Sequence, residues 1–465
     1  MTGNLLIDRS FNKKQAHRTY EGKGARERMN SSQRLKAFCA ETAYGLALVG
    51  SLLAGCSEPA PDQIKQPLSY HRDIAPIVDN YCGSCHSHSG IGHFSLGTFA
   101  EVSRYAPLIR GAVANGTMPP WLPSQDSRPL HGSRLLRTQD KDDLLRWIDE
   151  GMAEGNPSDP PRTDLPPKAV VTPPRADLVL DPGRNYLPDG TQNDDYHCFV
   201  FDPKLTTDRF ITAGDALPGN HHIVHHIIAY EIPEAEAAAI KAKDPTGQGY
   251  TCFGSPGTMS PPVTILGWAP GGVATRYPQG TALRLHKGSL LVMQVHYNVL
   301  EGKGQADRTT MQFELTDEAP QKELHSLPVA RPKQLLIPAG AADAVQTIEF
   351  PLSVLLSRFG LPSSKLTVYG HTPHMHLLGT KISTELNGAK LIDIPRWDFH
   401  WQQGYMFQSP YQASGNDTFK LECHYNNTAE HQPVVGGVKQ TPRDVTWGEG
   451  TLDEMCLNYL LLSAE

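Results

Sequence analysis

The sequence lacks any run of apolar residues long enough to cross a membrane. A spanning helix needs about 20 of them in succession, whereas the apolar stretch at 43–54 covers twelve residues and nothing later is comparable. A surplus of positive charge is also missing, since 42 Lys and Arg stand against 49 Asp and Glu. The formal net charge of −7 therefore gives no reason to expect a nucleic-acid partner.

Long helical patterns are scarce as well, which argues against an all-helical protein. The chain instead contains 38 Pro, 41 Gly and an ordinary 39% of hydrophobic residues. Its later part holds short alternating runs bounded by Gly, Pro and Asp, such as HCFVFDP, HHIIAYEI, SLLVMQVHYNVL, TTMQFEL, QTIEFPL and LTVYGH. Such runs are typical of antiparallel β-sandwiches. This mixture predicts turn-rich β-domains beside a small helical one.

The N-terminal region predicts export. The first 28 residues are polar and charged and look like an upstream extension, so translation starts at either Met1 or Met29. Arg34 and Lys36 then form a basic stretch, and the apolar run at 43–54 fits the core of a signal peptide. We therefore expect an export signal that is absent from the mature protein.

The end of this signal resembles a bacterial lipobox. Leu53, Ala54 and Gly55 precede Cys56, the position at which a lipoprotein cysteine is acylated. Ser57 follows in place of an aspartate, which favours the outer membrane. We expect a periplasm-facing lipoprotein of the bacterial cell envelope that touches the membrane only through lipid on Cys56. An ordinary cleaved signal is the alternative.

Proline-rich stretches divide the chain. SEPAPDQIKQP reads as a tether, and NPSDPPRTDLPPKAVVTPP as a linker that cannot form a helix or a central strand. A further break at EAPQK splits the β-region into two halves. The expected parts are an extension and signal peptide at 1–56, a tether at 57–67, a small all-α domain at 68–155, a linker at 156–174, and β-sandwiches at 175–317 and 318–465.

A Cys-x-x-Cys-His motif at Cys82, Cys85 and His86 predicts a covalently bound haem c. The two thiols would form thioether bonds with the vinyl groups, and the imidazole would bind the iron. A redox-active dithiol is the competing interpretation. No βαβ pattern surrounds the motif, however, and a dithiol leaves His86 unexplained.

The sixth iron ligand is expected to be a methionine, because a thioether raises the potential of an electron-transfer haem. Met118 in GTMPPWLP is the candidate, since two prolines stiffen its loop and Trp121 can cover the haem edge. Met152 is the alternative. The whole run from His71 to Pro157 resembles the small cytochrome c domains fused to bacterial periplasmic oxidases.

Histidines are concentrated in the second half, in HHIVHH, QVHYN and HTPHMH. Imidazoles at this density without carboxylate clusters favour copper or zinc. His225 and His226 are adjacent and point to opposite faces of a strand, so they can bind one metal only at a strand end or a bulge. His374 and His376 are two residues apart and share a face.

The motifs VHHIIAY, QVHYN, HMHLLG and DEMC occur in an order that resembles the copper type II ascorbate-dependent monooxygenases, over roughly residues 175–465. The resemblance implies two jelly-roll sandwiches with one copper each. An electron-transfer copper would be held by His225, His226 and His296. An oxygen-activating copper would be held by His374, His376 and Met455, with the family tyrosine kept at Tyr459.

Four cysteines remain after the lipid and haem positions: Cys198, Cys252, Cys423 and Cys456. In an exported chain they predict two disulfides, and three pairings are possible. The resemblance implies the pairs Cys198–Cys252 and Cys423–Cys456.

Two positions depart from the peptide-amidating members of the family. Thr372 stands where they have an arginine, and Leu457 stands where they have an asparagine. Without the arginine, the charge-assisted grip on a substrate carboxylate is lost. This argues against C-terminal glycine peptides as substrates.

The expected protein is thus a small all-α cytochrome c domain followed by two all-β jelly-roll domains, carrying two copper ions and one haem c. It would hydroxylate a C–H bond of a small molecule with dioxygen, using electrons from ascorbate or a periplasmic redox protein, with the haem as an intermediate donor. The alternative is a haem–copper electron-transfer or copper-binding protein without oxygenase activity.

Haem attachment can be tested on denatured protein. We expect the wild-type chain to keep its haem on a denaturing gel stained for haem peroxidase, because thioether bonds survive where coordination does not. Cys82→Ala and Cys85→Ala should each weaken the staining. A wild-type chain that releases all its haem on denaturation would contradict the prediction.

Overall fold

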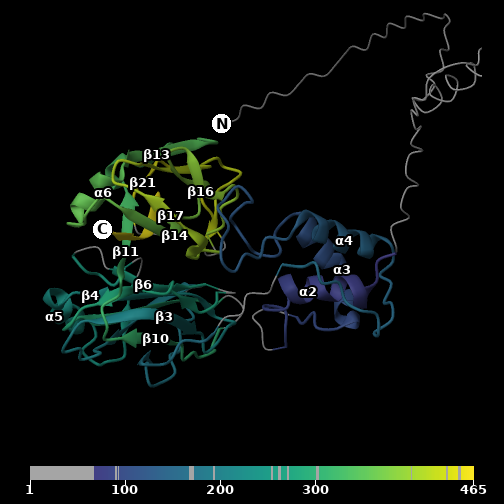
Figure 1. Ribbon diagram of the computed structural model, residues 1–465, viewed down its shortest axis with the longest axis horizontal. Helices are drawn as coiled ribbons and strands as arrows, with labels where there is room; N and C mark the ends of the chain where they lie inside the picture. Colours follow the sequence, from purple (N-terminus) through teal and green to yellow (C-terminus); the bar gives the residue numbers. More distant parts are fainter. Residues whose placement is uncertain are drawn as a thin grey trace, which may run out of the picture. The chain divides into compact units, whose positions relative to one another are not determined.

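The computed structural model describes residues 67–88, 92, 94–166, 172–191, 194–252, 255–259, 263–269, 272–299, 303–399, 401–435, 438–448 and 452–465 (Figure 1). The chain forms two units, Met1–Gln66 and Pro67–Glu465, and the second is described here. The expected signal peptide, the lipidated Cys56 and nearly all of the tether lie outside the described residues. None of the described helices is long and apolar enough to span a membrane.

A small helical domain comes first. Its elements are the π-helix η1 (Tyr70–Ile74) and the α-helices α2 (Ala75–Tyr81), α3 (Phe99–Ala114) and α4 (Thr138–Asp149). The helix α3 begins with a capping box, in which Thr98 and Glu101 satisfy each other's backbone N–H groups. Apolar side chains from all four helices close one core, including Ile74, Ile77, Val102, Leu144 and Trp147.

Part of the expected linker packs against these helices. The Arg162 guanidinium donates to Asp143 at 3.1 Å and pairs with Asp140 at 3.3 Å. Asp140 is fully buried and also accepts from Tyr81 at 2.9 Å. A buried carboxylate needs such partners, so Arg162 ties residues 156–166 to the helical domain. Residues 167–171 lie outside the described part of the chain.

The rest of the chain is almost entirely β-structure, as expected. A five-stranded sheet has the order β5 (Tyr250–Thr251), β2 (Asp194–Phe201), β9 (Leu290–Asn298), β4 (Val224–Ile232), β6 (Val263–Trp268). A four-stranded sheet has the order β13 (Ala344–Pro351), β18 (Thr418–Tyr425), β15 (Gly379–Leu386), β16 (Ala389–Ile394). Minor elements are the pairs β12 (Leu336–Ile337) with β21 (Val445–Thr446) and β19 (Val434–Val435) with β20 (Val438–Lys439), and the helices α5 (Glu234–Lys243), η2 (Pro332–Gln334) and α6 (Leu352–Arg358).

One large sheet runs through both sandwiches. Its order is β1 (Leu178–Leu180), β10 (Thr310–Thr316), β3 (Arg209–Leu217), β8 (Thr281–Leu285), β11 (Lys322–Ala330), β22 (Leu457–Ala464), β14 (Leu366–His374), β17 (Tyr405–Ala413), and β7 (Thr275–Arg276) also pairs with β3. The chain passes between sandwiches at β11, which pairs in parallel with β8 and antiparallel with β22. Each sandwich keeps its own apolar core, one around Phe313 and the other around Phe419.

The helical domain also contacts the second sandwich directly. Leu130 forms an antiparallel bridge with Phe407 of β17, the last strand of the large sheet. His131 N donates to the Met406 carbonyl at 2.8 Å, and Gln408 N donates to the Pro129 carbonyl at 2.9 Å. The loop between α3 and α4 therefore adds a short strand-like segment to the edge of this sheet, a contact that the sequence patterns did not predict.

Both disulfides form with the pairing that the family resemblance implied. Cys198 of β2 joins Cys252, just after β5, and Cys423 of β18 joins Cys456, just before β22. The prediction is therefore confirmed. The second disulfide lies directly beside Met455.

Loss of the second disulfide should lower stability and loosen the Met455 segment. Cys423→Ala/Cys456→Ala opens a loop with a sequence separation of 33, and we expect the free energy of unfolding to fall by about 3–4 kcal/mol. Denaturant titration measures this loss. Cys198→Ala/Cys252→Ala is the matched control, because it should destabilise the chain similarly while leaving metal binding at His374, His376 and Met455 intact. Equal loss of that metal in both variants would show that the second disulfide has no special role there.

Candidate metal centres

Three imidazoles converge where β4 and β9 run side by side. His226 lies directly opposite His296 in the antiparallel register, and a bulge between Val224 and His226 holds His225. The bulge inserts one residue into the strand and turns both adjacent histidines to one side. The Nδ1 atoms of the three rings are 3.1–3.3 Å apart.

This arrangement fits one metal ion. The centre of a triangle with these sides lies about 1.9 Å from each nitrogen, close to the ~2.0 Å of a metal–imidazole bond. Burial, followed by the neighbouring His296 and His225, lowers the pKa of His226 well below its usual value. Neutral imidazoles keep the lone pairs that a metal requires. Residues that the sequence singled out thus meet in space with ligand geometry.

Asp194 on β2 orients this cluster. Its carboxylate lies 2.8 Å from His296 Nε2 and also accepts from the Asn298 amide at 3.2 Å. When His296 donates from Nε2, its Nδ1 lone pair faces the other two rings. The Tyr196 ring stacks on His296 with centroids 4.1 Å apart. Sequence reasoning missed Asp194, because its position depends on the pairing of β2 with β9.

The second donor set lies at the end of β14 and before β22. The rings of His374 and His376 have centroids 5.0 Å apart. His374 Nδ1 bonds to the Gln402 side-chain oxygen, and His376 Nδ1 donates to the Asp453 carbonyl at 3.1 Å. In this tautomer both rings carry the lone pair that a metal would use on Nε2. Burial and the neighbouring His376 lower the pKa of His374 to about 3.

Gln402 is a further residue that the sequence did not single out. Its amide nitrogen donates to the Phe399 carbonyl at 2.8 Å. This bond fixes the side chain, so its oxygen remains toward His374. Phe399, Trp401 and Gln402 lie outside regular secondary structure, and no periodic pattern in the sequence marks them.

Glu454 joins the loop after β14 to the segment before β22. It is fully buried, and its carboxylate accepts from the backbone N–H groups of His376 at 2.8 Å, Leu378 at 2.6 Å and Met455 at 3.1 Å. Burial raises the pKa of Glu454 to about 8, although these bonds oppose the rise. The Tyr425 hydroxyl adds a bond to the Met455 carbonyl at 2.9 Å.

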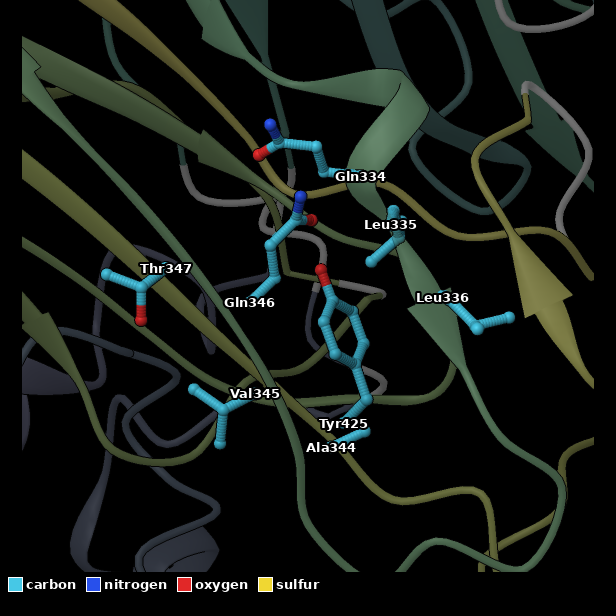
Figure 2. A pocket seen from close by; sticks show the side chains of 8 residues that line it. All are labelled: Gln334, Leu335, Leu336, Ala344, Val345, Gln346, Thr347 and Tyr425. Atoms are coloured by element: carbon cyan, nitrogen blue, oxygen red, sulfur yellow. The ribbon is translucent and has the colours of Figure 1, made fainter.

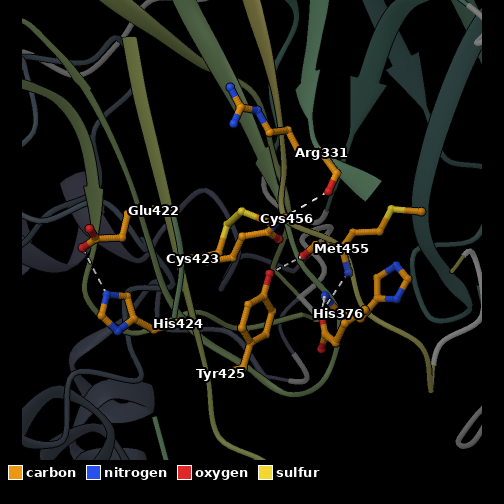
Figure 3. The surroundings of a disulfide bond; sticks show 10 residues. Arg331, His376, Glu422, Cys423, His424, Tyr425, Met455 and Cys456 are labelled. Carbon is orange, nitrogen blue, oxygen red and sulfur yellow. Dashed lines mark hydrogen bonds and ion pairs between the residues drawn. A yellow bond between two sulfur atoms is a disulfide. The ribbon is translucent and has the colours of Figure 1, made fainter. Parts of the chain in front are cut away.

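Figure 3 shows how Met455 and His376 lie beside these bonds. The side chains of Met455 and His376 extend to the same side, away from the Cys423–Cys456 disulfide. Met455 is only 5% exposed. A thioether and two imidazoles are therefore presented together from segments that lie far apart in the sequence.

Both donor sets border one cavity of about 1630 Å³. His226 of the first set and His374, His376 and Met455 of the second set line it. His374 is also one of the groups that lower the pKa of His226. The two candidate centres therefore share one chamber.

Tyr459 and Thr372 also line this chamber. They are directly opposite each other in the pairing of β14 with β22. Thr372, which stands where the peptide-amidating members have an arginine, is thus an uncharged side chain beside Tyr459.

A smaller cavity of about 220 Å³ lies between β12 and β13 (Figure 2). Its lining consists of aliphatic and amide side chains with Thr347 and Tyr425. None of the described residues that line it is a histidine, cysteine or methionine.

The predicted haem-attachment residues follow α2. Both thiols, Cys82 and Cys85, are free. His86 Nδ1 donates to the Phe94 carbonyl at 3.0 Å, which leaves Nε2 for a metal. The three groups needed for a covalent, ligated haem are thus present together. Met118 lies 43% exposed in the loop after α3, and Met152 packs against the helical core.

Comparison with known protein families finds matches in the two β-sandwich regions. Residues 184–304 match the N-terminal domain, and residues 355–462 the C-terminal domain, of copper type II ascorbate-dependent monooxygenase. The first range contains the three-histidine cluster, and the second contains His374, His376 and Met455. The helical domain lies outside both ranges.

Curated relatives are similar at low identity. Tyramine beta-hydroxylase of Caenorhabditis briggsae is 23% identical over 289 residues, covering 59% of this chain and 43% of that protein. Dopamine beta-hydroxylase of Canis lupus familiaris is 20% identical over 277 residues, with 57% and 40% covered. Dopamine beta-hydroxylase of Bos taurus is 22% identical over 326 residues, which cover 64% of this chain and 48% of that protein. The chain spans less than half the length of these relatives.

The orienting residues should tune the two centres independently. Asp194→Ala removes the acceptor for His296 and should weaken metal binding at the three-histidine centre by about 10- to 100-fold. Gln402→Met should do the same at the His374 centre. Competition of purified protein with a copper chelator measures each affinity. Asp202→Asn, in an exposed ion pair just after β2, is the control and should change neither. A wild-type affinity in Asp194→Ala would show that the carboxylate does not position His296.

Proposed function

We propose that this chain, which carries both domains of the copper type II ascorbate-dependent monooxygenases, is a copper-dependent monooxygenase that hydroxylates a C–H bond of a small molecule. The observation that carries the proposal is the pair of different donor sets on one chamber. Three Nδ1 atoms form one set, and two imidazoles with a thioether form the other. Each set lies within one of the two matching domains.

The chemistry of the donors favours copper over zinc. A thioether ligand stabilises Cu(I), whereas zinc sites use imidazole, thiolate and carboxylate. Met455 is buried with its side chain beside His376, and a backbone network from Glu454 holds it there. When bound, copper supplies reversible one-electron chemistry and a site for dioxygen at the Met455 set.

The overall reaction requires an external source of electrons. One oxygen atom enters the C–H bond and the other becomes water, which consumes two electrons and two protons for each dioxygen. Ascorbate or a periplasmic redox protein would supply the electrons. The three-histidine set tolerates both oxidation states of copper, so His225, His226 and His296 suit the relay of an electron toward the Met455 set.

A haem c bound by Cys82, Cys85 and His86, with Met118 as the proposed sixth ligand, would provide the electrons or add to those from ascorbate. The free thiols and the fixed ring of His86 support this assignment. The contact of Leu130 with Phe407 supports a functional link, because it ties the helical domain to the sandwich of the Met455 set.

The same proposal includes export. Acylation of Cys56 would hold the protein on the periplasmic side of the cell envelope, and thioether formation and two disulfides both suit an oxidising compartment. The supporting observation from the structure is the pair of formed disulfides.

The substrate is proposed to be a small molecule without a carboxylate at the Thr372 side of the chamber. Thr372 and Tyr459 offer only neutral polar groups there. The volume of the chamber leaves room for an aromatic substrate beside both centres.

A haem–copper electron carrier without a substrate is the second candidate. Electron carriers need neither two distinct copper sites nor a large chamber between them. Dioxygen consumption with a reductant, measured with and without candidate substrates, separates the two functions.

Removal of the thioether tests the enzyme assignment. Met455→Leu keeps the side-chain volume but removes the soft ligand, and we expect hydroxylation to fall by about 100-fold or more. His296→Ala should also stop turnover while leaving the Met455 set able to bind copper. Product formation and copper content per chain measure the two effects. Met406→Leu, which replaces another methionine of the same chamber, is the control and should stay active. Full activity in Met455→Leu would refute the assigned role.

A further inference from the structure

Four polar side chains meet where the helical domain touches the second sandwich. Arg134 comes from the loop between α3 and α4, and Trp401, Gln403 and Tyr405 come from the segment that leads into β17. The Arg134 guanidinium lies over the Trp401 ring at 5.3 Å and donates to the Gln403 oxygen at 3.5 Å. It also lies 5.6 Å from the Trp121 ring, which contacts Tyr405 edge-on at 5.4 Å.

Buried donors in this cluster lack a well-aligned hydrogen bond to the described residues. They are the Trp401 indole nitrogen and the neighbouring Gln403 amide and Tyr405 hydroxyl, of which the amide lies close enough to oppose the rise that burial causes in the pKa of Tyr405. Tyr405 is only 3% exposed. Leaving a buried donor unpaired costs free energy, and a group of such donors at one place favours an acceptor that is not part of the protein.

The chemistry of the cluster defines that acceptor. Indole N–H and guanidinium groups can only donate, and Arg134 carries a permanent positive charge. The Trp121 and Trp401 rings lie 5.6 and 5.3 Å from the guanidinium, which is half-buried. The planar fork of guanidinium donors, flanked by aromatic rings, matches a carboxylate.

We propose that Arg134, Trp401, Gln403 and Tyr405 form a carboxylate-binding site at the domain junction. The site borders the chamber of the metal centres, since Arg134, Gln403 and Tyr405 all line it. Gln402, one residue from the site, holds His374. A carboxylate bound here sits beside the oxygen-activating set, on elements other than Thr372 and Tyr459.

The carboxylate at this site has two candidate sources. The haem of the proposed function carries propionates, and Ser84 of the attachment motif lines the same chamber. The other source is a free carboxylate that enters the chamber, as a substrate or a product would. Only the first source rests on haem attachment.

The first arm of the test examines the haem in the holoprotein. Gln403→Met and Trp401→Phe each remove one donor while keeping a similar side chain. If the site binds a propionate, both variants should lower the haem midpoint potential and shift the propionate bending bands in resonance Raman spectra, because the negative charge is less well neutralised. Gln408→Met is the control, since Gln408 bonds to Leu130 across the same junction at 3.0 Å but lies outside the cluster.

The second arm uses free ligands. Phenylacetate should bind the wild-type holoprotein in calorimetry if the site takes an external carboxylate, and phenethylamine should not compete. Loss of one charge-assisted hydrogen bond in Gln403→Met or Trp401→Phe should weaken phenylacetate binding by about 10- to 100-fold. Gln408→Met should bind as the wild type does.

Either response supports the carboxylate site and identifies its source. Absence of both, in protein that keeps covalent haem and two coppers, would overturn the proposal. Protein that binds phenylacetate through this cluster but holds no covalent haem would remove the haem from the proposed function and leave the carboxylate site standing. Conversely, attached haem with an unchanged potential and no phenylacetate binding refutes this site alone.

Discussion

The parallel pairing of β11 with β8 is the constraint on which the arrangement of this molecule depends. It joins two sandwiches, each with its own core, into one continuous sheet. On one side of the pairing lie β3 and β10 of the first sandwich, and on the other side lie β22, β14 and β17 of the second. Because a sheet resists sliding between hydrogen-bonded strands, the strands that end in His374 and begin after Met455 are held in register with the first sandwich.

The two donor sets are built by different means. The three-histidine cluster lies on neighbouring strands, so backbone register and one bulge suffice to bring its Nδ1 atoms together. The other set combines the end of a strand, a turn and a distant segment. It therefore depends on the buried Glu454, which satisfies backbone groups of both segments at once. In the first set the orienting contact of His296 is made at Nε2, and in the second set the histidines are fixed at Nδ1. Each set thus exposes the opposite ring nitrogen.

The candidate ligand residues could be picked out from the sequence, because short motifs contain them and adjacent histidines on a strand require a bulge or a strand end. The two disulfides followed from the family resemblance. Asp194, Gln402 and Glu454 were not predictable, since each acts through a contact set by strand register or loop path. The path of the proline-rich linker was not predictable either, because a stretch unable to form a helix has no periodic pattern that reveals its contacts. Arg162 pairs with Asp140 and Asp143 and holds residues 156–166 against the helices.

The segment at 129–131 has a consequence for the strand that it covers. β17 ends the large sheet, and an uncovered terminal strand offers a row of free N–H and C=O groups to other chains. The helical domain occupies part of that row through Pro129 and His131. It therefore hinders the pairing of strands from other molecules with β17. A fragment that begins after the linker would lose this protection and be prone to aggregate, however well its two cores were packed.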